Sequence, residues 1–329
     1  MSFEHLVSQI KKNNFLIIGR AGIDIYPDPP GTKTEDANNF VTHLGGSSAN
    51  IAVELTKLGG NCNLLTRVSD DALGRLAINQ LKKYNINTDL IKFQGSEARI
   101  SFAIVESRIE DHQSIIYRNG AADSFMNESD IINTRIEGYD CVILTGTCFA
   151  TEPSRSASFL AMKIANDNNI PVIMDIDYRP YTWTSAKDAS ITYINAAKKC
   201  AVVIGNDDEF GVLSIDYDKG YDFAKSLANE IDLVIYKKGE KGSVTFMKNN
   251  EFSKGIFEVK PLKPTGAGDA FMGGLIGSLL NDYSIEESVE IGSAAAAIVV
   301  TKVGCAPAMP LQNEIEDFMK SNKIKNYID

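Results

Sequence analysis

Residues 263–274 read KPTGAGDAFMGG and lead directly into the apolar run LIGSLL at residues 275–280. Glycines that allow a close backbone approach, followed at once by a helical pattern, predict a helix N-terminus whose free N–H groups face an anion. Phosphate is the expected anion, because small side chains leave room for a phosphoryl group. The donors would come from four consecutive residues, Gly266, Ala267, Gly268 and Asp269.

Asp269 would lie in the first turn of this helix, where the helix dipole favours the ionised carboxylate. A negative group beside a phosphate is unfavourable unless it has a chemical task. Accepting a proton from an attacking hydroxyl is such a task, so we interpret Asp269 as a general base. The alternative is that Asp269 only caps the helix after a glycine turn.

The composition limits the classes of partner and compartment. The chain has 329 residues and a net charge of −10, which argues against broad binding to nucleic acid or anionic membranes. The apolar run FLIIG is too short to span a bilayer, and the residues before it lack the pattern of a signal peptide. Five scattered cysteines without CxxC spacing indicate reduced thiols. We therefore expect a cytoplasmic protein.

The order of expected elements predicts an α/β fold. Apolar strands and helices alternate from residue 140 onward: a helix at 154–169, a strand at 171–177, a helix at about 185–199, and strands at 201–206 and 232–239. Strands rich in Val and Ile indicate a mostly parallel central sheet with helices on both faces. Short alternating strands at about 26–44 and 91–122 predict a small β-sheet lid. We expect one domain over residues 1–329.

Polar residues follow several of the predicted strands. Open α/β sheets bind ligands at the carboxyl ends of their strands, so these residues are candidates for one site. They are Asp24, Asp175, Asp177, Arg179, Asn206, Glu209, Lys238 and Gly239.

Two common nucleotide motifs do not occur. The chain has no GxxxxGK[ST] P-loop, and no GxGxxG follows the first strand. The signatures of protein kinases are missing as well. The late TGAGD turn at 265–269 therefore remains the predicted phosphate site.

Two stretches together resemble a known family. GGSSANIAVELTKLGG at 45–60 and KPTGAGDAFMGGLI at 263–276 are similar to the paired signatures of the ribokinase/PfkB carbohydrate kinases, and RVSDDALGR, NDDE and KKGEKGS match further family elements. GRAGIDIYP, YRNGAAD and DIDYRPYTW resemble the members that phosphorylate the sugar acid of myo-inositol breakdown. The resemblance implies a ribokinase-like fold and covers nearly the whole chain.

The resemblance also implies an activity. It is ATP-dependent phosphorylation of the terminal hydroxyl of a keto-deoxy sugar acid, with 5-dehydro-2-deoxy-D-gluconate as the expected substrate. The alternatives are 2-keto-3-deoxygluconate and fructose. A sugar-binding pseudo-kinase is the non-enzymatic alternative, and an intact Asp269 argues against it.

The family motifs assign roles to individual positions. Asp269 would be the base and the backbone of 266–269 the anion hole. Glu209 would hold Mg²⁺ through water. The resemblance implies sugar contacts at Asp24, Gly45, Gly46 and Asn50, and ATP contacts at Asn206, Lys238, Gly239, Gly242, Gly266 and Gly268.

Two arginines bear on the substrate class. A guanidinium binds a carboxylate with two parallel hydrogen bonds, which suits a sugar acid, so Arg118 and Arg179 are candidate substrate ligands. Each instead has a nearby acid with which it could pair, Asp123 and Asp177 respectively.

One position departs from the family pattern. Lys263 stands where many members carry an Asp that helps to bind a monovalent cation, which argues against activation by K⁺. VGCAPAMP at 303–310 nevertheless retains a loop suited to ligation by backbone carbonyls. Exposed edges of the lid strands would permit a homodimer.

Overall fold

The computed structural model describes residues 2–327, and their contacts group into two compact units. The first unit contains residues up to Ile18, the stretch Met126–Ile256 and the residues from Lys325 on. The second contains Gly19–Phe125 and Phe257–Ile324. Each unit therefore combines segments that are far apart in the sequence.

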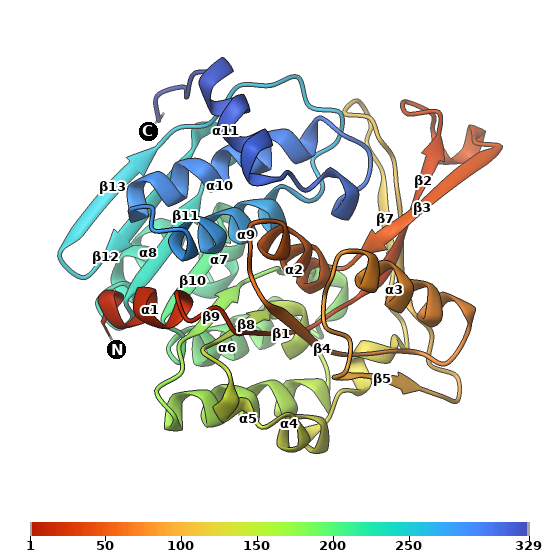
Figure 1. Cartoon of the computed structure of the whole chain (residues 1–329), viewed down its shortest axis with the longest axis horizontal. Helices are drawn as coiled ribbons and strands as arrows, with labels where there is room; N and C mark the ends of the chain where they lie inside the picture. Colours follow the sequence, from red (N-terminus) through yellow and green to blue (C-terminus); the bar gives the residue numbers. More distant parts are fainter. Residues whose placement is uncertain (1, 328–329) are drawn as a thin grey trace. The chain divides into compact units, whose positions relative to one another are not determined.

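The first unit is built on a sheet in the strand order β13-β12-β11-β10-β9-β8-β1 (Figure 1). The pairs from β1 to β11 are parallel, and β12 and β13 add an antiparallel hairpin. The parallel strands are almost entirely buried, which explains their continuous Val and Ile content. The strands are β1 (Phe15–Ile18), β8 (Cys141–Thr145), β9 (Val172–Asp175), β10 (Val202–Asn206), β11 (Leu233–Lys237), β12 (Ser243–Met247) and β13 (Asn250–Lys254).

Helices connect these strands and cover the sheet. Each parallel connection needs such a crossover, because a tight turn can join only antiparallel neighbours. The expected helices at 154–169 and 185–199 are present with slightly shorter bounds. The helices are α1 (Phe3–Ile10), α4 (Glu128–Thr134), α5 (Ser154–Asp167), α6 (Ala186–Ala197), α7 (Asp207–Ser214) and α8 (Gly220–Leu227).

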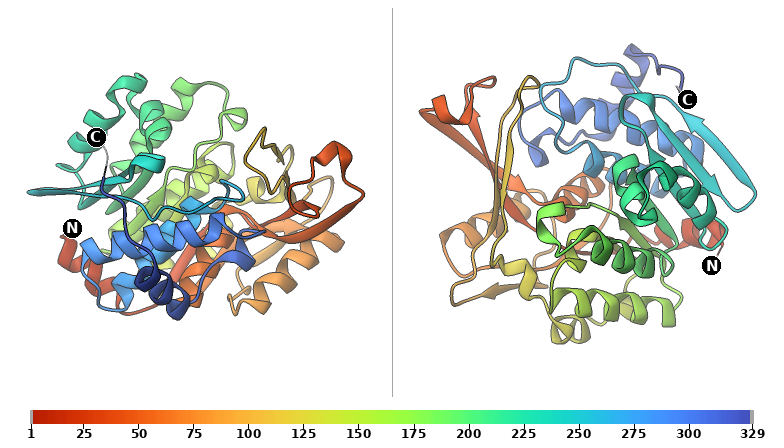
Figure 2. Two further views of the ribbon diagram at one scale, coloured as in Figure 1. Left: turned by 90° about the horizontal axis from the view of Figure 1, so that it is seen from above. Right: turned by 180° about the vertical axis from the view of Figure 1, so that it is seen from behind.

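The second unit contains a separate four-stranded sheet in the order β3-β2-β6-β7. Figure 2 shows β2 and β3 side by side as a long hairpin, and β2 pairs with β6 in parallel. The strands are β2 (Gly22–Asp28), β3 (Asn39–Gly45), β6 (Ser101–Val105) and β7 (Ser114–Tyr117). Tyr26 of β2 is fully buried and forms a small core with Ala103 and Val105 of β6. The expected small sheet is confirmed, and its role as a lid stays a prediction.

The remaining strands of the second unit do not join this small sheet. Strand β5 (Ile91–Gln94) falls inside the expected range 91–122, but it pairs in parallel with β4 (Cys62–Ser69). The short alternating pattern of residues 91–94 did not reveal this partner, because strand pairing is set by long-range packing. Within that range, β6 and β7 supply the strands of the small sheet.

Five helices complete the second unit: α2 (Ser47–Lys57), α3 (Ala72–Lys83), α9 (Ala267–Leu280), α10 (Ile285–Val300) and α11 (Gln312–Ser321). Ser284 and Glu287 form a capping box that starts α10. Small residues allow α9 to pack closely, since a Cβ on Gly273 would lie 2.5 Å from Cβ of Glu54 on α2. The expected α/β fold, with a mostly parallel sheet flanked by helices and a smaller separate sheet, is confirmed.

Candidate functional site

The turn before α9 has the geometry of an anion site. Gly266 has φ of 87° and is the N-cap of α9, and no side chain caps this helix end. Gly266 to Asp269 are only half-buried. A Cβ on Gly266 would lie 2.9 Å from Sγ of Cys305 and 3.0 Å from Cγ1 of Val299. Only glycine fits here without strain, for reasons of both φ and space.

Asp269 is joined directly to the predicted sugar site. Nδ2 of Asn50 donates a hydrogen bond of 2.8 Å to Oδ2 of Asp269. Asn50 is 3 % exposed, and its Oδ1 is buried without a hydrogen-bond partner. It lies in the first turn of α2. Gly46, with φ of 94°, is the N-cap of this helix. The structure thus brings the two family signatures together at one pair of side chains.

Asp24 lies on β2 against the glycines that precede α2. A Cβ on Gly45 would be 2.0 Å from Oδ1 of Asp24, so the carboxyl group rests on the bare Cα of Gly45. The hydroxyl of Tyr26 donates a hydrogen bond of 3.2 Å to Oδ2 of Asp24. Burial raises the pKa of Asp24 to about 6, while Arg20, this hydrogen bond and Lys263 act to lower it. Asp24 is therefore ionised at neutral pH but protonated in mild acid.

Arg20 is a further candidate for the site that the sequence reasoning missed. It is 7 % exposed, and its Nε is buried without a hydrogen-bond partner. Its carbonyl accepts a hydrogen bond from the amide of Ala49, which fixes the arginine beside the start of α2. An arginine between apolar residues in GRAGID was the available signal, because such a cation is buried only when it has a role.

Lys263 and Cys305 were also missed as neighbours of the site. Lys263 is fully buried, and Cys305 is 3 % exposed. Sγ of Cys305 lies 3.5 Å from the hydroxyl of Tyr26. Burial raises the pKa of Cys305 to about 11, so this thiol is protonated and unreactive at neutral pH. The group Asp24, Tyr26, Cys305 and Lys263 forms a polar cluster behind the turn.

Arg118 has an internal partner in the same unit. Its Nη2 forms an ion pair with Oδ2 of Asp123, and both side chains are buried. The pair joins the end of β7 to the short helical turn at Ala122–Phe125. The structure therefore shows the pairing that the sequence left open as the alternative to substrate binding.

Two of the predicted metal and nucleotide residues of the first unit, Asn206 and Glu209, are in direct contact. Asn206 ends β10 and caps α7 in a capping box with Glu209. Oε2 of Glu209 accepts a hydrogen bond of 2.8 Å from the amide of Asn206, and Oε1 accepts one of 3.1 Å from the amide of Tyr178. Burial, with the nearby charge of Asp175, raises the pKa of Glu209 to about 7.

Arg179 pairs with a carboxylate of this cluster. Nη2 of Arg179 lies 2.6 Å from Oδ1 of Asp177, which is 4 % exposed. The Arg179 side chain is 35 % exposed, and its Nη1 donates a hydrogen bond of 2.9 Å to the carbonyl of Tyr178. Burial raises the pKa of Asp175, and Lys237 opposes that shift. Three carboxyl groups, those of Asp175, Asp177 and Glu209, thus lie in one region together with the cations of Arg179 and Lys237.

Lys238 and two glycines shape the turn after β11. The amide of Lys238 donates a hydrogen bond of 2.7 Å to the carbonyl of Gly242. Gly239 and Gly242 both have positive φ, of 56° and 104°. Nζ of Lys238 donates a hydrogen bond of 2.7 Å to the hydroxyl of Tyr327. This turn has the tight backbone geometry that the KKGEKG pattern predicts.

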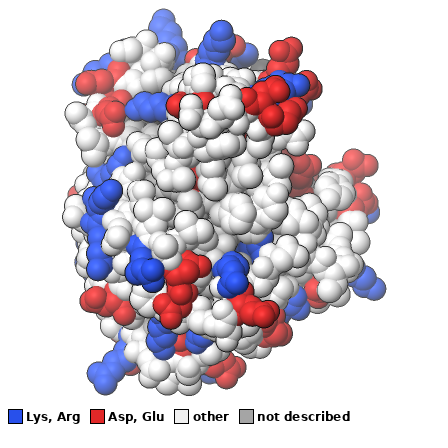
Figure 3. Space-filling view, turned by 90° about the vertical axis from the view of Figure 1, so that its right-hand side faces the viewer, with Lys and Arg blue, Asp and Glu red and all other residues white. Residues whose placement is uncertain are grey.

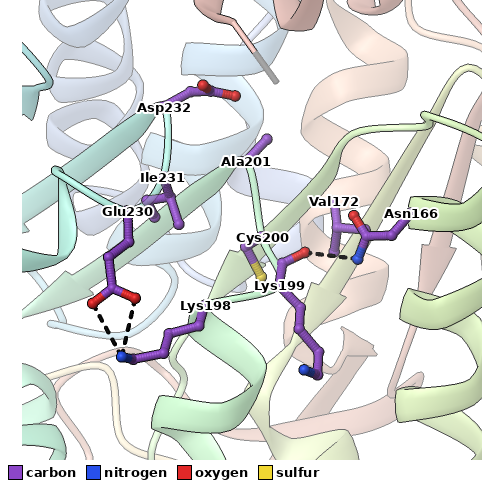
Figure 4. Close-up of a pocket in the computed structure, with 9 residues that line it drawn as sticks. All are labelled: Asn166, Val172, Lys198, Lys199, Cys200, Ala201, Glu230, Ile231 and Asp232. Carbon is purple, nitrogen blue, oxygen red and sulfur yellow. Dashed lines mark hydrogen bonds and ion pairs between the residues drawn. The ribbon is translucent and has the colours of Figure 1, made fainter.

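One cavity lies away from all these residues. It has a volume of about 290 Å³ and is lined by residues at the amino-terminal ends of β9, β10 and β11 (Figure 4). Its charged residues include Lys198 and Glu230, which form an ion pair of 3.0 Å. None of the predicted site residues lines it. Ligands of α/β sheets bind at the opposite, carboxyl ends of the strands, so this cavity is not the candidate site.

The surface charge is mixed in sign. On the face shown in Figure 3, Lys and Arg side chains are interspersed with Asp and Glu around a broad uncharged area. In the described residues 2–327, no helix is both long and apolar enough to cross a membrane.

Comparison with known proteins identifies the family of this chain. The family model described as pfkB family carbohydrate kinase matches residues 12–312. The 5-dehydro-2-deoxygluconokinase of Photobacterium profundum is 38 % identical over 316 residues, covering 94 % of this chain and 95 % of its own. That of Geobacillus kaustophilus is 34 % identical over 322 residues and 96 % of both chains.

A solved structure supports the fold. A putative ribokinase II from E. coli, in complex with ATP and Mg²⁺, aligns with a TM-score of 0.83 at 19 % identity and covers 94 % of this chain and 99 % of that one. The family match, the identities above 30 % over nearly the whole chain and the fold agree with one another. The chain belongs to the pfkB family of carbohydrate kinases.

Proposed function

We propose that this protein is an ATP-dependent kinase that phosphorylates the terminal hydroxyl of 5-dehydro-2-deoxy-D-gluconate. The observation that carries the proposal is the hydrogen bond of 2.8 Å from Asn50 to Asp269, beside the uncapped end of α9. It joins Asn50, a residue predicted to bind the sugar, to Asp269, the carboxylate in the predicted phosphate turn. A hydroxyl bound there would lie between a base and an anion site, which is the arrangement that phosphoryl transfer to an alcohol requires.

The chain's own residues then have separate tasks. Asp269 accepts the proton of the attacking hydroxyl, and the backbone N–H groups of 266–269 hold the migrating phosphoryl group. Asp24 and Asn50 bind sugar hydroxyls. The carboxylate of Asp24 can accept hydrogen bonds from them, and Oδ1 of Asn50 is a buried acceptor with no partner of its own. Phosphoryl transfer needs alignment and charge neutralisation more than a strong base, so an aspartate suffices.

The first unit supplies residues that fit Mg²⁺ and ATP. Mg²⁺ prefers hard oxygen ligands and keeps several of its waters. Glu209 offers such oxygens, whereas within residues 2–327 no group of three or more Asp, Glu, His or Cys side chains is arranged to hold a metal ion directly. When bound, Mg²⁺ would neutralise charge on the nucleotide phosphates. Asn206, Lys238, Gly239 and Gly242 are the proposed nucleotide contacts, and Glu209 would act through water.

Arg20 favours an acidic over a neutral sugar. A buried guanidinium with an unpartnered Nε is costly unless a ligand satisfies it. It lies close enough to Asp24 to lower the pKa of that carboxyl, so it is part of the proposed sugar site. Arg118 and Arg179 already pair with Asp123 and Asp177. We therefore propose Arg20 as the first candidate for the substrate carboxylate, and the two ion-paired arginines as the next.

ADP release with four sugars tests the function. The purified protein is assayed with 5-dehydro-2-deoxy-D-gluconate, 2-keto-3-deoxygluconate, fructose and ribose at equal ATP and Mg²⁺. The highest kcat/KM is expected for 5-dehydro-2-deoxy-D-gluconate. A higher value for fructose would overturn the sugar-acid proposal, and no sugar-dependent ADP release would favour a pseudo-kinase.

Three glutamine variants test the carboxylate contact. A hydrogen bond to a charged group contributes about 1.5–3 kcal/mol, so Arg20→Gln should raise KM for the acid roughly 10- to 150-fold and should impair fructose, which has no carboxylate, much less. Arg118→Gln and Arg179→Gln are made in parallel. A larger selective effect from either of these would transfer the role from Arg20 to that residue.

A further inference from the structure

Lys263 is a fully buried cation directly behind the phosphate turn. It is 0 % exposed. Its Nζ donates one hydrogen bond of 2.6 Å to the carbonyl of Thr265 and another of 3.2 Å to the carbonyl of Val299. Thr265 directly precedes Gly266, so the ammonium group holds the peptide that leads into the N-cap of α9.

The second acceptor is at the end of another helix. Val299 lies in the last turn of α10, where carbonyl groups lack partners within the helix and the helix dipole favours a cation. The backbone of the same segment is attached there too, since the amides of Leu262 and Lys263 donate to the carbonyl of Val300 at 2.7 and 3.1 Å. Lys263 thus ties the phosphate turn to the C-terminus of α10.

The charge of Lys263 also matters for the site. A buried ammonium is unfavourable unless negative groups and acceptors surround it. Burial lowers the pKa of Lys263, and the nearby Cys305, Asp24 and Asp269 raise it. The ammonium group of Lys263 therefore interacts with both carboxylates of the proposed site: Asp24, the proposed sugar contact, and Asp269, the proposed proton acceptor. It offsets charge that would otherwise oppose the approach of an anionic phosphate.

We propose that Lys263 is a positioning residue that serves as a permanently attached monovalent cation for the phosphate turn. It orients the Thr265–Gly266 peptide and balances Asp24 and Asp269, so the reaction needs no dissolved K⁺. A free cation does not fit the same place, because the carbonyls of Thr265 and Val299 already bind an ammonium group. This inference rests on the proposed kinase function.

The first experiment measures kcat and KM of the wild-type protein from 0 to 200 mM KCl, with choline chloride keeping the ionic strength constant at roughly 0.2 M, where surface charges are largely screened. The expected kcat does not change with KCl. Lys263→Met keeps most of the side-chain length and removes the charge. It should lower kcat by about tenfold to a hundredfold with little change in KM for ATP, because a small misplacement of the turn weakens alignment.

Added cations separate this role from simple packing. Lys263→Ala leaves space, so ammonium, methylammonium or K⁺ should restore part of its kcat, and none of them should affect Lys263→Met to the same extent. Lys320→Ala is the control, because Lys320 is an exposed lysine of the same unit whose Nζ pairs with Asp317 on α11, away from the proposed site. Lys320→Ala should keep its kcat and respond to no cation.

A second measurement does not depend on turnover. The melting temperature of Lys263→Ala should rise when KCl or ammonium chloride replaces choline chloride, while that of the wild type stays constant. A wild type that requires K⁺ for turnover, or a Lys263→Ala variant with normal kcat and no cation response, would overturn the proposal. If no sugar is phosphorylated at all, the proposed function fails, and the melting experiment still decides whether Lys263 replaces a cation.

Discussion

Replacing Asp269 by Asn tests the proposed base with little disturbance of the structure. The two side chains have the same shape, and the carbonyl oxygen of Asn can accept the hydrogen bond of 2.8 Å that Asn50 now donates to Asp269. The backbone of the turn is unchanged. The substitution therefore removes the proton acceptor while leaving both the sugar contact and the anion site in place.

The expected loss follows from this single change. A positioned general base contributes about 10²- to 10⁴-fold in rate, which corresponds to roughly 3–5.5 kcal/mol at about 1.4 kcal/mol per tenfold. We expect kcat of Asp269→Asn to fall by that factor. KM for the sugar should change by less than about threefold, because the hydroxyl contacts remain. Binding of ATP should be unchanged or slightly tighter, since one negative charge beside the phosphates is gone.

The assay is ADP release under saturating sugar and ATP, together with calorimetric titration of ATP into each variant. Asp89→Asn is the control, because Asp89 is an exposed aspartate of the same unit that lies outside the proposed site. Its kcat should equal that of the wild type. An Asp269→Asn variant that retains more than about a third of the wild-type kcat would remove Asp269 from the chemistry, since even the weakest general bases contribute about a hundredfold.

Three further outcomes are expected. Gly266→Ala forces alanine to adopt φ of 87° with its Cβ 2.9 Å from Sγ of Cys305. The kcat should therefore fall at least about tenfold, and the free energy of unfolding should fall by about 1–3 kcal/mol. A normal kcat would mean that the phosphate binds elsewhere. KM for the sugar should rise as pH falls below about 6, where Asp24 becomes protonated and loses acceptor capacity, and a flat pH profile would exclude Asp24 as a sugar ligand. Glu54 is fully buried with both carboxyl oxygens unpartnered, and burial raises its pKa well above 4.5, so the free energy of unfolding should decline as pH rises above 4.5. Urea unfolding at pH 5, 6.5 and 8 should show a smaller decline for Glu54→Gln, and equal declines in the two proteins would contradict the buried-acid explanation.

The local chemistry of the sequence was sufficient for the fold class and for the glycine turn that starts α9. A glycine turn that starts a helix needs few distant contacts, so residues 263–274 indicated the N-terminus of α9, and Gly266 is its N-cap. Continuous apolar runs separated by helical periods likewise indicated the parallel sheet of β1 and β8–β11. Such patterns are readable because backbone conformation and burial repeat with the period of each element.

The tertiary structure decided which side chains meet. The hydrogen bond between Asn50 and Asp269 joins positions 219 apart in sequence, and no local pattern specifies that contact. The substrate arginines could not be chosen from sequence, because an arginine and a nearby acid can pair with each other or with a ligand, and the ion pairs of Arg118 and Arg179 depend on the packed backbone.

The same reason explains the two basic residues that were not assigned to the site. Lys263 read as a departure from a family pattern, but its complete burial and its bonds to Thr265 and Val299 arise only when α10 packs behind the turn. In the sequence, Arg20 is one residue of a strand-like segment. Its position follows only from the folded chain, in which the start of α2 bonds to its backbone. Sequence alone determined the elements and their chemistry, whereas burial and charge pairing depended on contacts between distant segments, which only the folded chain defines.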